Sequence, residues 1–145
     1  MQPRFTELVF RVADIEAEAA FYEEAVGLTR LRPKPGEPID RVVVFDMGGP
    51  RLELHHGGRT LERPTARDQV SCGPVLLVDD CEAALERAVG WGATQVGPIS
   101  APVPGSAFVY VLSPGGQAVG FVQGDERQYR ARLGMPPQAS YWPAE

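Results

Sequence analysis

The amino-acid sequence predicts an α+β fold made of two tandem βαβββ modules, which form a cup-shaped mixed sheet with the helices on its outer face. Two observations lead to this prediction. A strand, an aspartate, a helix and a glycine follow one another over residues 8–27, and the same succession returns over residues 74–92. Each copy continues with a short strand and a hairpin that turns at a pair of glycines. A unit repeated in this way is typical of a duplicated module.

The first copy begins with a run of apolar and β-branched residues at 8–12, which predicts a β-strand. Asp14 stands where the N-cap of a helix is expected, because its carboxylate can accept a hydrogen bond from a backbone N–H of the first turn. Alanine and phenylalanine side chains then recur at helical spacing from Ala17 to Ala25, and Gly27 is expected to end the helix.

The second copy has a strand at 75–78, followed by two aspartates. Glu82 is positioned to complete a capping box with Asp79, and Gly90 and Gly92 are expected to close the helix. The predicted apolar stripe of this helix consists of Cys81, Leu85, Ala88 and Val89. At a constant offset of 66 residues, four residues of the first copy recur in the second: Val12, Asp14, Glu16 and Ala17 return as Val78, Asp80, Glu82 and Ala83.

A β-hairpin completes each copy. The predicted segments are strands 42–45 and 51–55 around a turn at 46–50, and strands 108–112 and 117–122 around a turn at 113–116. A short strand is expected after each helix, near 29–31 and near 94–96. Proline-rich loops at 32–40 and 97–104 connect these short strands to the hairpins.

We expect a single domain over residues 1–145. Its predicted parts are module one at 5–56, a linker at 57–72, module two at 73–123 and a tail at 124–145. The tail is expected to form a short helix through Arg132. Its last aromatic residues, Tyr141 and Trp142, leave three roles open: a lid over a pocket, a dimer arm or a disordered end.

Composition and charge argue against several classes of partner. The chain carries 14 Lys and Arg against 19 Asp and Glu, a net charge of −5, and therefore no positive surface for nucleic acid is expected. No stretch approaches the ~20 apolar residues that a membrane span needs, and the start lacks the apolar core of a signal peptide. We therefore expect a cytoplasmic protein with no membrane partner. The two cysteines, Cys72 and Cys81, are expected to be reduced.

Alternation along the strands collects polar side chains on the side of module one that faces away from its helix. These residues are Glu7 and Arg11 on the first strand and Arg51, Glu53 and His55 on the last. If this side faces solvent, Glu7 and Glu53 are surface carboxylates paired with Arg11 and Arg51. If the helix-free sides of two modules curve together, the same residues line a cup.

The corresponding side of module two is apolar and consists of small or aliphatic residues: Gly73, Val75 and Leu77 on one strand and Ala118, Gly120 and Val122 on another. Small side chains are expected to leave volume, and an apolar cavity with a few polar groups at one end is typical of a small-molecule pocket. Either Phe108 or Tyr110 is expected to stack on a planar ligand. The residues predicted to contact the ligand are Arg11, Phe45, Arg51, Val75, Leu77, Phe108, Tyr110, Ala118 and Gly120.

Over residues 5–123 the chain resembles the vicinal oxygen chelate superfamily, which includes glyoxalase I, the bleomycin-resistance proteins, the fosfomycin-resistance enzymes and the extradiol dioxygenases. The resemblance is carried by residues 7–14, by Phe21, Tyr22, Gly27 and Leu28, by the strand at 51–55 and by the turn at 113–116. This scaffold serves several chemistries and also proteins that only sequester a drug, so the resemblance implies a fold and not one reaction.

In this superfamily four side chains, typically His, Glu or Gln, surround one divalent cation, and the resemblance assigns the first two positions to Glu7 and Glu53. The repeat assigns the other two to Gly73 and Gly120, which have no side chain to bind a metal. A divalent-metal site is therefore incomplete unless Cys72 or a shifted residue completes it. The resemblance also implies a homodimer, in which module one of one chain faces module two of the other.

Two classes of function remain open. The first is a binding protein of the bleomycin-resistance type, which sequesters or carries an amphipathic small molecule, and the acidic balance favours a cationic one. The second is a metal-dependent lyase, isomerase, dioxygenase or thiol transferase, with Glu7 and Glu53 on the metal and His55 as general base or nitrogen ligand. A metal-free version of this enzyme would use Glu7 or Glu53, with a pKa raised by burial, to abstract a proton beside a carbonyl.

Overall fold

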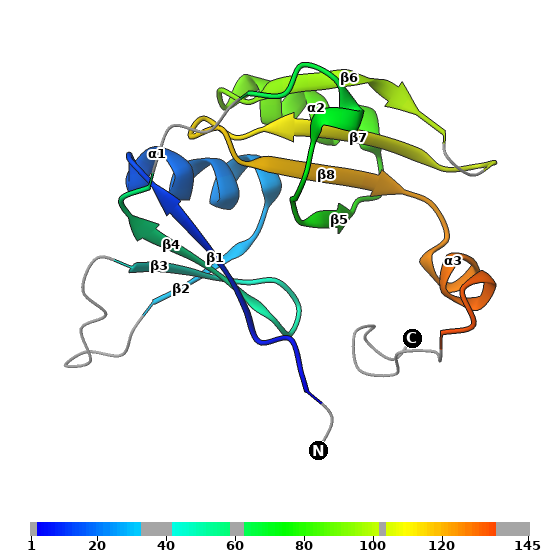
Figure 1. Ribbon diagram of the computed structural model, residues 1–145, viewed down its shortest axis with the longest axis horizontal. Helices are drawn as coiled ribbons and strands as arrows, with labels where there is room; N and C mark the ends of the chain where they lie inside the picture. The colour runs from blue at the N-terminus through cyan, green and yellow to red at the C-terminus, as the bar shows by residue number, and fades with distance from the viewer. Residues whose placement is uncertain (1–2, 33–41, 59–62, 102–103, 136–145) are drawn as a thin grey trace.

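The computed structural model describes residues 3–32, 42–58, 63–101 and 104–135, and the predicted succession of elements occurs in it twice (Figure 1). The first module consists of β1 (Glu7–Val12), α1 (Ile15–Ala20), η1 (Phe21–Val26), β2 (Thr29–Leu31), β3 (Val42–Asp46) and β4 (Arg51–His56). The second consists of β5 (Val75–Leu77), α2 (Cys81–Gly90), β6 (Thr94–Ser100), β7 (Ala107–Leu112) and β8 (Ala118–Gln123). The 3-10 helix η2 (Arg67–Gln69) precedes the second module, and α3 (Glu126–Arg132) follows it. The predicted α+β fold of two βαβββ modules is confirmed.

Each module forms a four-stranded mixed sheet from the described residues. The strand orders are β1-β4-β3-β2 and β5-β8-β7-β6, so the first strand of each module lies beside its last strand. This pairing is parallel in both modules, whereas the other pairings are antiparallel. Consequently β1 and β5 lie at the edges of their sheets.

Both long helices begin at an aspartate. The carboxylate of Asp14 accepts a hydrogen bond from the backbone N–H of Ala17 at 3.0 Å, as predicted. In the second module the N-cap is Asp80, which accepts from Ala83 at the same distance. The capping box predicted on Asp79 is therefore wrong by one residue, and the repeat itself, which pairs Asp14 with Asp80, gives the correct position.

The first helix continues from α1 into the π-helical segment η1 without a break. It ends at Gly27, whose φ of +82° lies in the left-handed region that glycine adopts without strain. The π-helical segment contains two buried aromatic side chains, Phe21 and Tyr22, both of them at 0% exposure.

Two predicted details of the second module need correction or extension. Helix α2 buries Cys81, Ala84 and Ala88, while Val89 is 48% exposed and does not belong to the apolar stripe. Strand β6 extends into the predicted loop and pairs Ser100 with Phe108 after an irregularity in register. The tail helix is confirmed as α3. The other proline-rich loop, apart from its first residue, and the residues Tyr141 and Trp142 lie outside the described residues.

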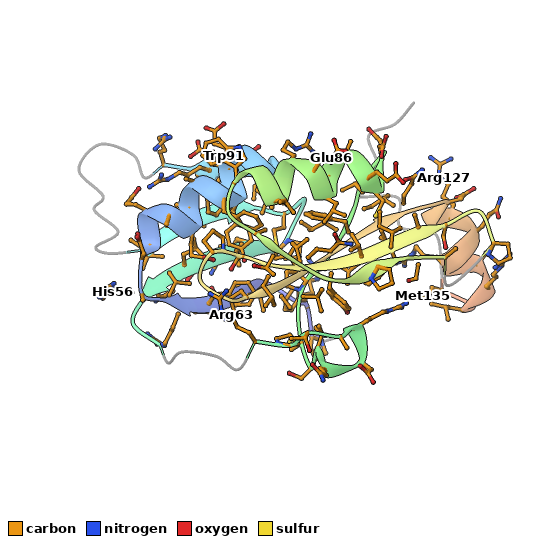
Figure 2. All side chains as sticks on the ribbon, turned by 90° about the horizontal axis from the view of Figure 1, so that it is seen from above. His56, Arg63, Glu86, Trp91, Arg127 and Met135 are labelled. Carbon is orange, nitrogen blue, oxygen red and sulfur yellow. The ribbon has the colours of Figure 1, made fainter. Side chains whose placement is uncertain are left out.

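The two modules share one hydrophobic core, which lies between the sheets and the helices. Tyr22 is at its centre, with ring centroids 5.2 Å from Phe21 and 6.0 Å from Phe45. Figure 2 shows the helices of both modules along the same side of the molecule. Arg87 of α2 donates to the carbonyl of Ala25 at 2.8 Å and so links the helices of the two modules. Among the described residues, no helix has the length and apolar character needed to cross a membrane.

The linker covers part of the second sheet on the side away from the helices, where η2 lies in Figures 1 and 2. Val70 packs on a small cluster of Val96, Leu112 and Ala118. The guanidinium carbon of Arg67 lies 4.7 Å from the ring centroid of Phe108, and Nη1 of Arg67 donates to the hydroxyl of Ser100 at 2.7 Å. The segment that the sequence presents only as a linker is thus packed on the face where a ligand cavity was predicted.

Candidate functional site

A row of charged and polar side chains lies on the open face of module one, the face turned away from the helices. The row consists of Glu7 on β1 and Arg51, Glu53 and His55 on β4, and we refer to it as the charged row. Its residues share a face because the parallel pairing of β1 with β4 brings Glu7 opposite Arg51, and side chains two apart on a strand point the same way. The intervening residues, Leu52 and Leu54, are fully buried on the helix side.

Arg51 is the centre of the charged row. Its Nη2 donates to Oε2 of Glu7 at 2.8 Å, and its Nε donates to Oε1 of Glu53 at 2.8 Å. The second oxygen of Glu53 lies 2.9 Å from Nε2 of His55. Of the two arginines expected beside these carboxylates, Arg51 forms ion pairs with both Glu7 and Glu53.

These contacts keep Glu53 ionised. The hydrogen bond from Arg51, followed by that from His55, lowers the pKa of Glu53 from its ordinary 4.5 to about 2. The same contact with Glu53, followed by the charge of Glu7, raises the pKa of Arg51. This lowered pKa is the opposite of the raised pKa that a metal-free base at Glu53 would need, because a cation and a second donor stabilise the charged form of Glu53 more than partial burial destabilises it.

His55 is oriented by this carboxylate. Because Glu53 is ionised and can only accept, the hydrogen between the two groups belongs to Nε2 of His55, and in the neutral form of the imidazole this tautomer leaves a lone pair on Nδ1. The side chain of His55 is 29% exposed, so part of it is accessible from outside the protein. A carboxylate that fixes the tautomer of a histidine is a common arrangement for a general base.

The carboxylates assigned to a metal are both occupied by an arginine. Glu7 and Glu53 direct oxygen atoms at the guanidinium of Arg51, so a fixed positive charge lies where a divalent cation would need those ligands. Among the described residues, no group of three or more His, Cys, Asp or Glu side chains is arranged to hold a metal ion.

The remaining two metal positions have no room for a ligating side chain. A Cβ on Gly73 would lie 2.5 Å from the carbonyl oxygen of Ala118, and a Cβ on Gly120 would lie 3.0 Å from Val75 and 3.1 Å from Phe108. Cys72, the residue that could have substituted, is an exposed free thiol. The residues present therefore do not fit the four-ligand divalent site that the superfamily resemblance implies.

The open face of module two is filled around Gly120, although a small cavity remains beside Ala118. Phe108 and Tyr110 pack edge to face at 4.8 Å and lie against Gly120, and the linker covers Ala118 and Phe108. The aliphatic residues of β5 stay accessible, since Val75 is 47% and Leu77 41% exposed.

The structure separates the predicted ligand contacts into two groups. Accessible or partly accessible are Arg11, Arg51, Val75, Leu77 and Tyr110. Buried are Phe45, Phe108, Ala118 and Gly120. Phe45 is placed on the wrong face by the prediction: it pairs with Leu52, points to the helices and packs on Tyr22 in the core.

A small cavity lies beside the linker, and of the residues predicted to contact a ligand it is lined by Ala118 alone. It has a volume of about 250 Å³. Its lining residues are Pro64, Gln69, Val70, Ser71, Cys72, Leu112, Gly116, Gln117 and Ala118. The sequence signal that could have indicated it is Val70, a β-branched apolar residue in a mostly polar linker.

Comparison with known families agrees with this architecture. The model of the Glyoxalase-like domain family matches residues 7–133, which include every strand of both modules. The chain belongs to this family. The charged row lies within this glyoxalase-like domain. The chain is a member of the vicinal oxygen chelate superfamily. No curated protein matches the chain.

Solved structures are similar to this glyoxalase-like domain over nearly its whole length. A glyoxalase-related enzyme from Fulvimarina pelagi has 20% identity and a TM-score of 0.67, with 97% of this chain and 96% of that chain covered. The fosfomycin resistance protein FosX from Listeria monocytogenes has 14% identity and a TM-score of 0.68, with 88% and 98% covered. At these identities the likeness concerns the fold alone.

Proposed function

We propose that this glyoxalase-like protein binds an amphipathic small molecule on its open faces and does so without a divalent metal. The observation that supports this most directly is the guanidinium of Arg51 between Glu7 and Glu53, a built-in cation that satisfies both carboxylates. The polar end of a ligand would meet the charged row, while Val75 and Leu77 offer exposed apolar surface for its other end.

We further propose that a homodimer brings these two surfaces together. β1 and β5 are edge strands, and they expose Val9, Val75 and Leu77, between 41% and 47% accessible. A second copy that places its module two opposite module one would cover these side chains and enclose the charged row in a cup. This arrangement gives the ligand an apolar wall and a polar end, in a cytoplasmic protein as the sequence predicts.

The metal question is tested by thermal unfolding with the ions alone. Mn²⁺ and Zn²⁺ are titrated against the wild type and against Glu7→Gln/Glu53→Gln, because a ligand that binds the folded state raises Tm with its concentration. We expect no saturable rise in either protein. A wild type that purifies with about one metal per chain and loses it in the double variant would overturn the metal-free proposal.

The ligand surface is tested with two amphipathic fluorophores of opposite charge, anilinonaphthalene sulfonate and ethidium. We expect saturable binding of at least one by the wild type and its loss in Val75→Asp/Leu77→Asp. Val89→Asp is the matched control, since Val89 is 48% exposed but lies on the helix side. Sedimentation of the same proteins tests the dimer: we expect the double variant to be monomeric, and a monomeric wild type would contradict the proposed cup.

A second candidate function is metal-free acid–base catalysis, and the 2.9 Å contact between His55 and Glu53 favours it. In this case Nδ1 of His55 takes a proton from a carbon beside a carbonyl, and the imidazolium formed is stabilised by the carboxylate of Glu53. The test is deuterium uptake from heavy water into a panel of small ketones and keto acids, in the presence of a chelator. Uptake that is lost in His55→Gln supports catalysis, and no uptake by the wild type supports binding alone.

A further inference from the structure

Glu18 of α1 is an acidic side chain buried at the contact between the two modules. Its exposed fraction is 1%, and it lies against the turn that connects β7 to β8. One carboxyl oxygen accepts the backbone N–H of Gly115, across a sequence separation of 97 residues. Gly115 leaves room for this contact, because a Cβ there would lie 2.7 Å from Oε1 of Glu18. Glu18 thus joins the helix of module one to the hairpin of module two.

The other carboxyl oxygen of Glu18 is less well satisfied. Among the described residues, neither Oε2 of Glu18 nor the hydroxyl of Tyr22 has a hydrogen-bond partner in good geometry; both atoms are buried, and the side chain of Ser113 is the polar group that interacts with both residues. A buried carboxylate with an unpaired oxygen is costly, whereas the neutral acid is much less so.

The charges that face Glu18 do not favour ionisation either. Burial raises its pKa and the negative charge of Asp14 raises it further, while the hydrogen bonds from Ser113 and Gly115 act in the opposite direction. The charge of Glu18 in turn raises the pKa of Tyr22, which burial has already moved well above its ordinary value. None of the groups that shift the pKa of Glu18 is a cation.

We propose that Glu18 is a proton-dependent latch between the two modules. As a neutral acid it holds the turn at 113–116 against α1, and on ionisation it loosens this joint. The contribution of Glu18 to the free energy of unfolding is complete at acidic pH, where the acid is neutral. It is lost as the pH rises through the titration of Glu18 in the folded protein. The latch depends on the packing of the modules and not on the function proposed above.

The experiment follows the amide of Gly115 by NMR in the wild-type protein as the pH is raised. Because this amide donates to Glu18, its chemical shift reports the ionisation of that carboxyl. We expect a midpoint clearly above the ~4.3 of an ordinary glutamate. A midpoint at or below that value, or a shift that does not change with pH, overturns the proposal.

Urea unfolding over the same pH range supplies a second measurement. Glu18→Gln keeps an acceptor for Gly115 and carries no charge, so its midpoint concentration should exceed that of the wild type increasingly as the pH rises through the Gly115 titration. Glu24→Gln, an exposed residue of η1, is the matched control and should follow the wild type. A constant difference between Glu18→Gln and the wild type at all pH values contradicts the latch. If Glu18→Gln does not fold, the NMR titration of the wild type still decides.

Discussion

The open faces of the two modules occupy the same place in the same repeat, yet their chemistry is opposite. Module one has the charged row, in which Arg51 holds two carboxylates. Module two has an aromatic pair, Phe108 and Tyr110, packed on Gly120 and partly covered by the linker. The helix sides, in contrast, are alike: both helices begin at an aspartate and bury small residues in a common core. The duplication has therefore kept the packing that holds the modules together and changed the surface that meets other molecules.

The largest expected effect comes from restoring the missing acidic ligand in module two. Gly120→Glu would force a carboxylate between Val75, Phe108 and Tyr110, whose atoms lie 3.0–3.1 Å from a Cβ at this position. An uncompensated buried charge costs about 3–5 kcal/mol, so we expect a loss of stability of that size or failure to fold.

Gly90→Ala is the control for this change, because a Cβ at Gly90 meets nothing within 4 Å. Urea unfolding at neutral pH should show no loss for this variant. A stable Gly120→Glu protein that also binds Mn²⁺ would mean that the two faces are less different than the structure indicates.

The next effect concerns the cation of module one. Arg51→Ala removes two hydrogen-bonded ion pairs from a half-exposed arginine, so we expect a measurable loss in the free energy of unfolding, smaller than that of Gly120→Glu. It also leaves Glu7 and Glu53 without their shared cation, so Tm of this variant should rise with added Mn²⁺ while that of the wild type does not.

Two variants make the Arg51 result specific. Arg11→Ala removes an exposed arginine from the same face of β1 and should gain no response to Mn²⁺. Arg51→Ala/Glu53→Gln should lose the response that Arg51→Ala gains. An equal response in all of these proteins would mean that the ion binds elsewhere.

The charged row also predicts a pH dependence. Because the pKa of Glu53 is lowered from 4.5 to about 2 in the folded protein, its ion pair stabilises the fold above pH 4.5 and is lost as the pH falls toward 2. Glu53→Gln should therefore be less stable than the wild type by about 1 kcal/mol at neutral pH, with the difference closing in acid. Urea unfolding at a series of pH values measures this, and a difference that persists at pH 2 would show that Glu53 acts through packing instead of charge.

The smallest effect is expected from weakening the contact between the linker and the open face of module two. Arg67→Ala removes the cation–π contact with Phe108 and the hydrogen bond to Ser100, and we expect a loss of about 0.5–1 kcal/mol. The aromatic pair should then be more accessible, which increased binding of a hydrophobic fluorophore would detect. Arg63→Ala, a change in the same linker away from the ring, is the control. Unchanged fluorophore binding in Arg67→Ala would mean that Val70 alone keeps the face covered.

Local chemistry allowed most of the fold to be predicted from the sequence. Asp14 and Asp80 mark helix starts by their capping ability, and the glycine pairs mark the hairpin turns, so each signal lies within a few residues of the feature that it predicts. Strand alternation likewise placed Glu7 and Glu53 on one face.

The features that were missed depend on contacts distant in sequence. Phe45 lies in a run of apolar residues with no alternation, so only its pairing with Leu52 reveals which face it occupies. The position of Arg51 opposite Glu7 follows from the register of β1 and β4, and the cover over Phe108 follows from the path of the linker. Glu18 is a polar residue on a helix for which the sequence makes no prediction; it is buried where the turn of the second module docks on this helix.

The parallel pairing of β1 with β4 has a consequence for how the chain folds. The partners Glu7 and Arg51 are 44 residues apart, while the hairpin of β3 and β4 closes locally. Contacts between distant residues form slowly because a long loop must be closed first. During synthesis on the ribosome, β1 therefore cannot pair until β4 has emerged, and β5 likewise cannot pair until β8 has emerged. Each edge strand is made first in its module but completes its sheet last, so this is the stage at which an unpaired strand is most open to pairing with another chain.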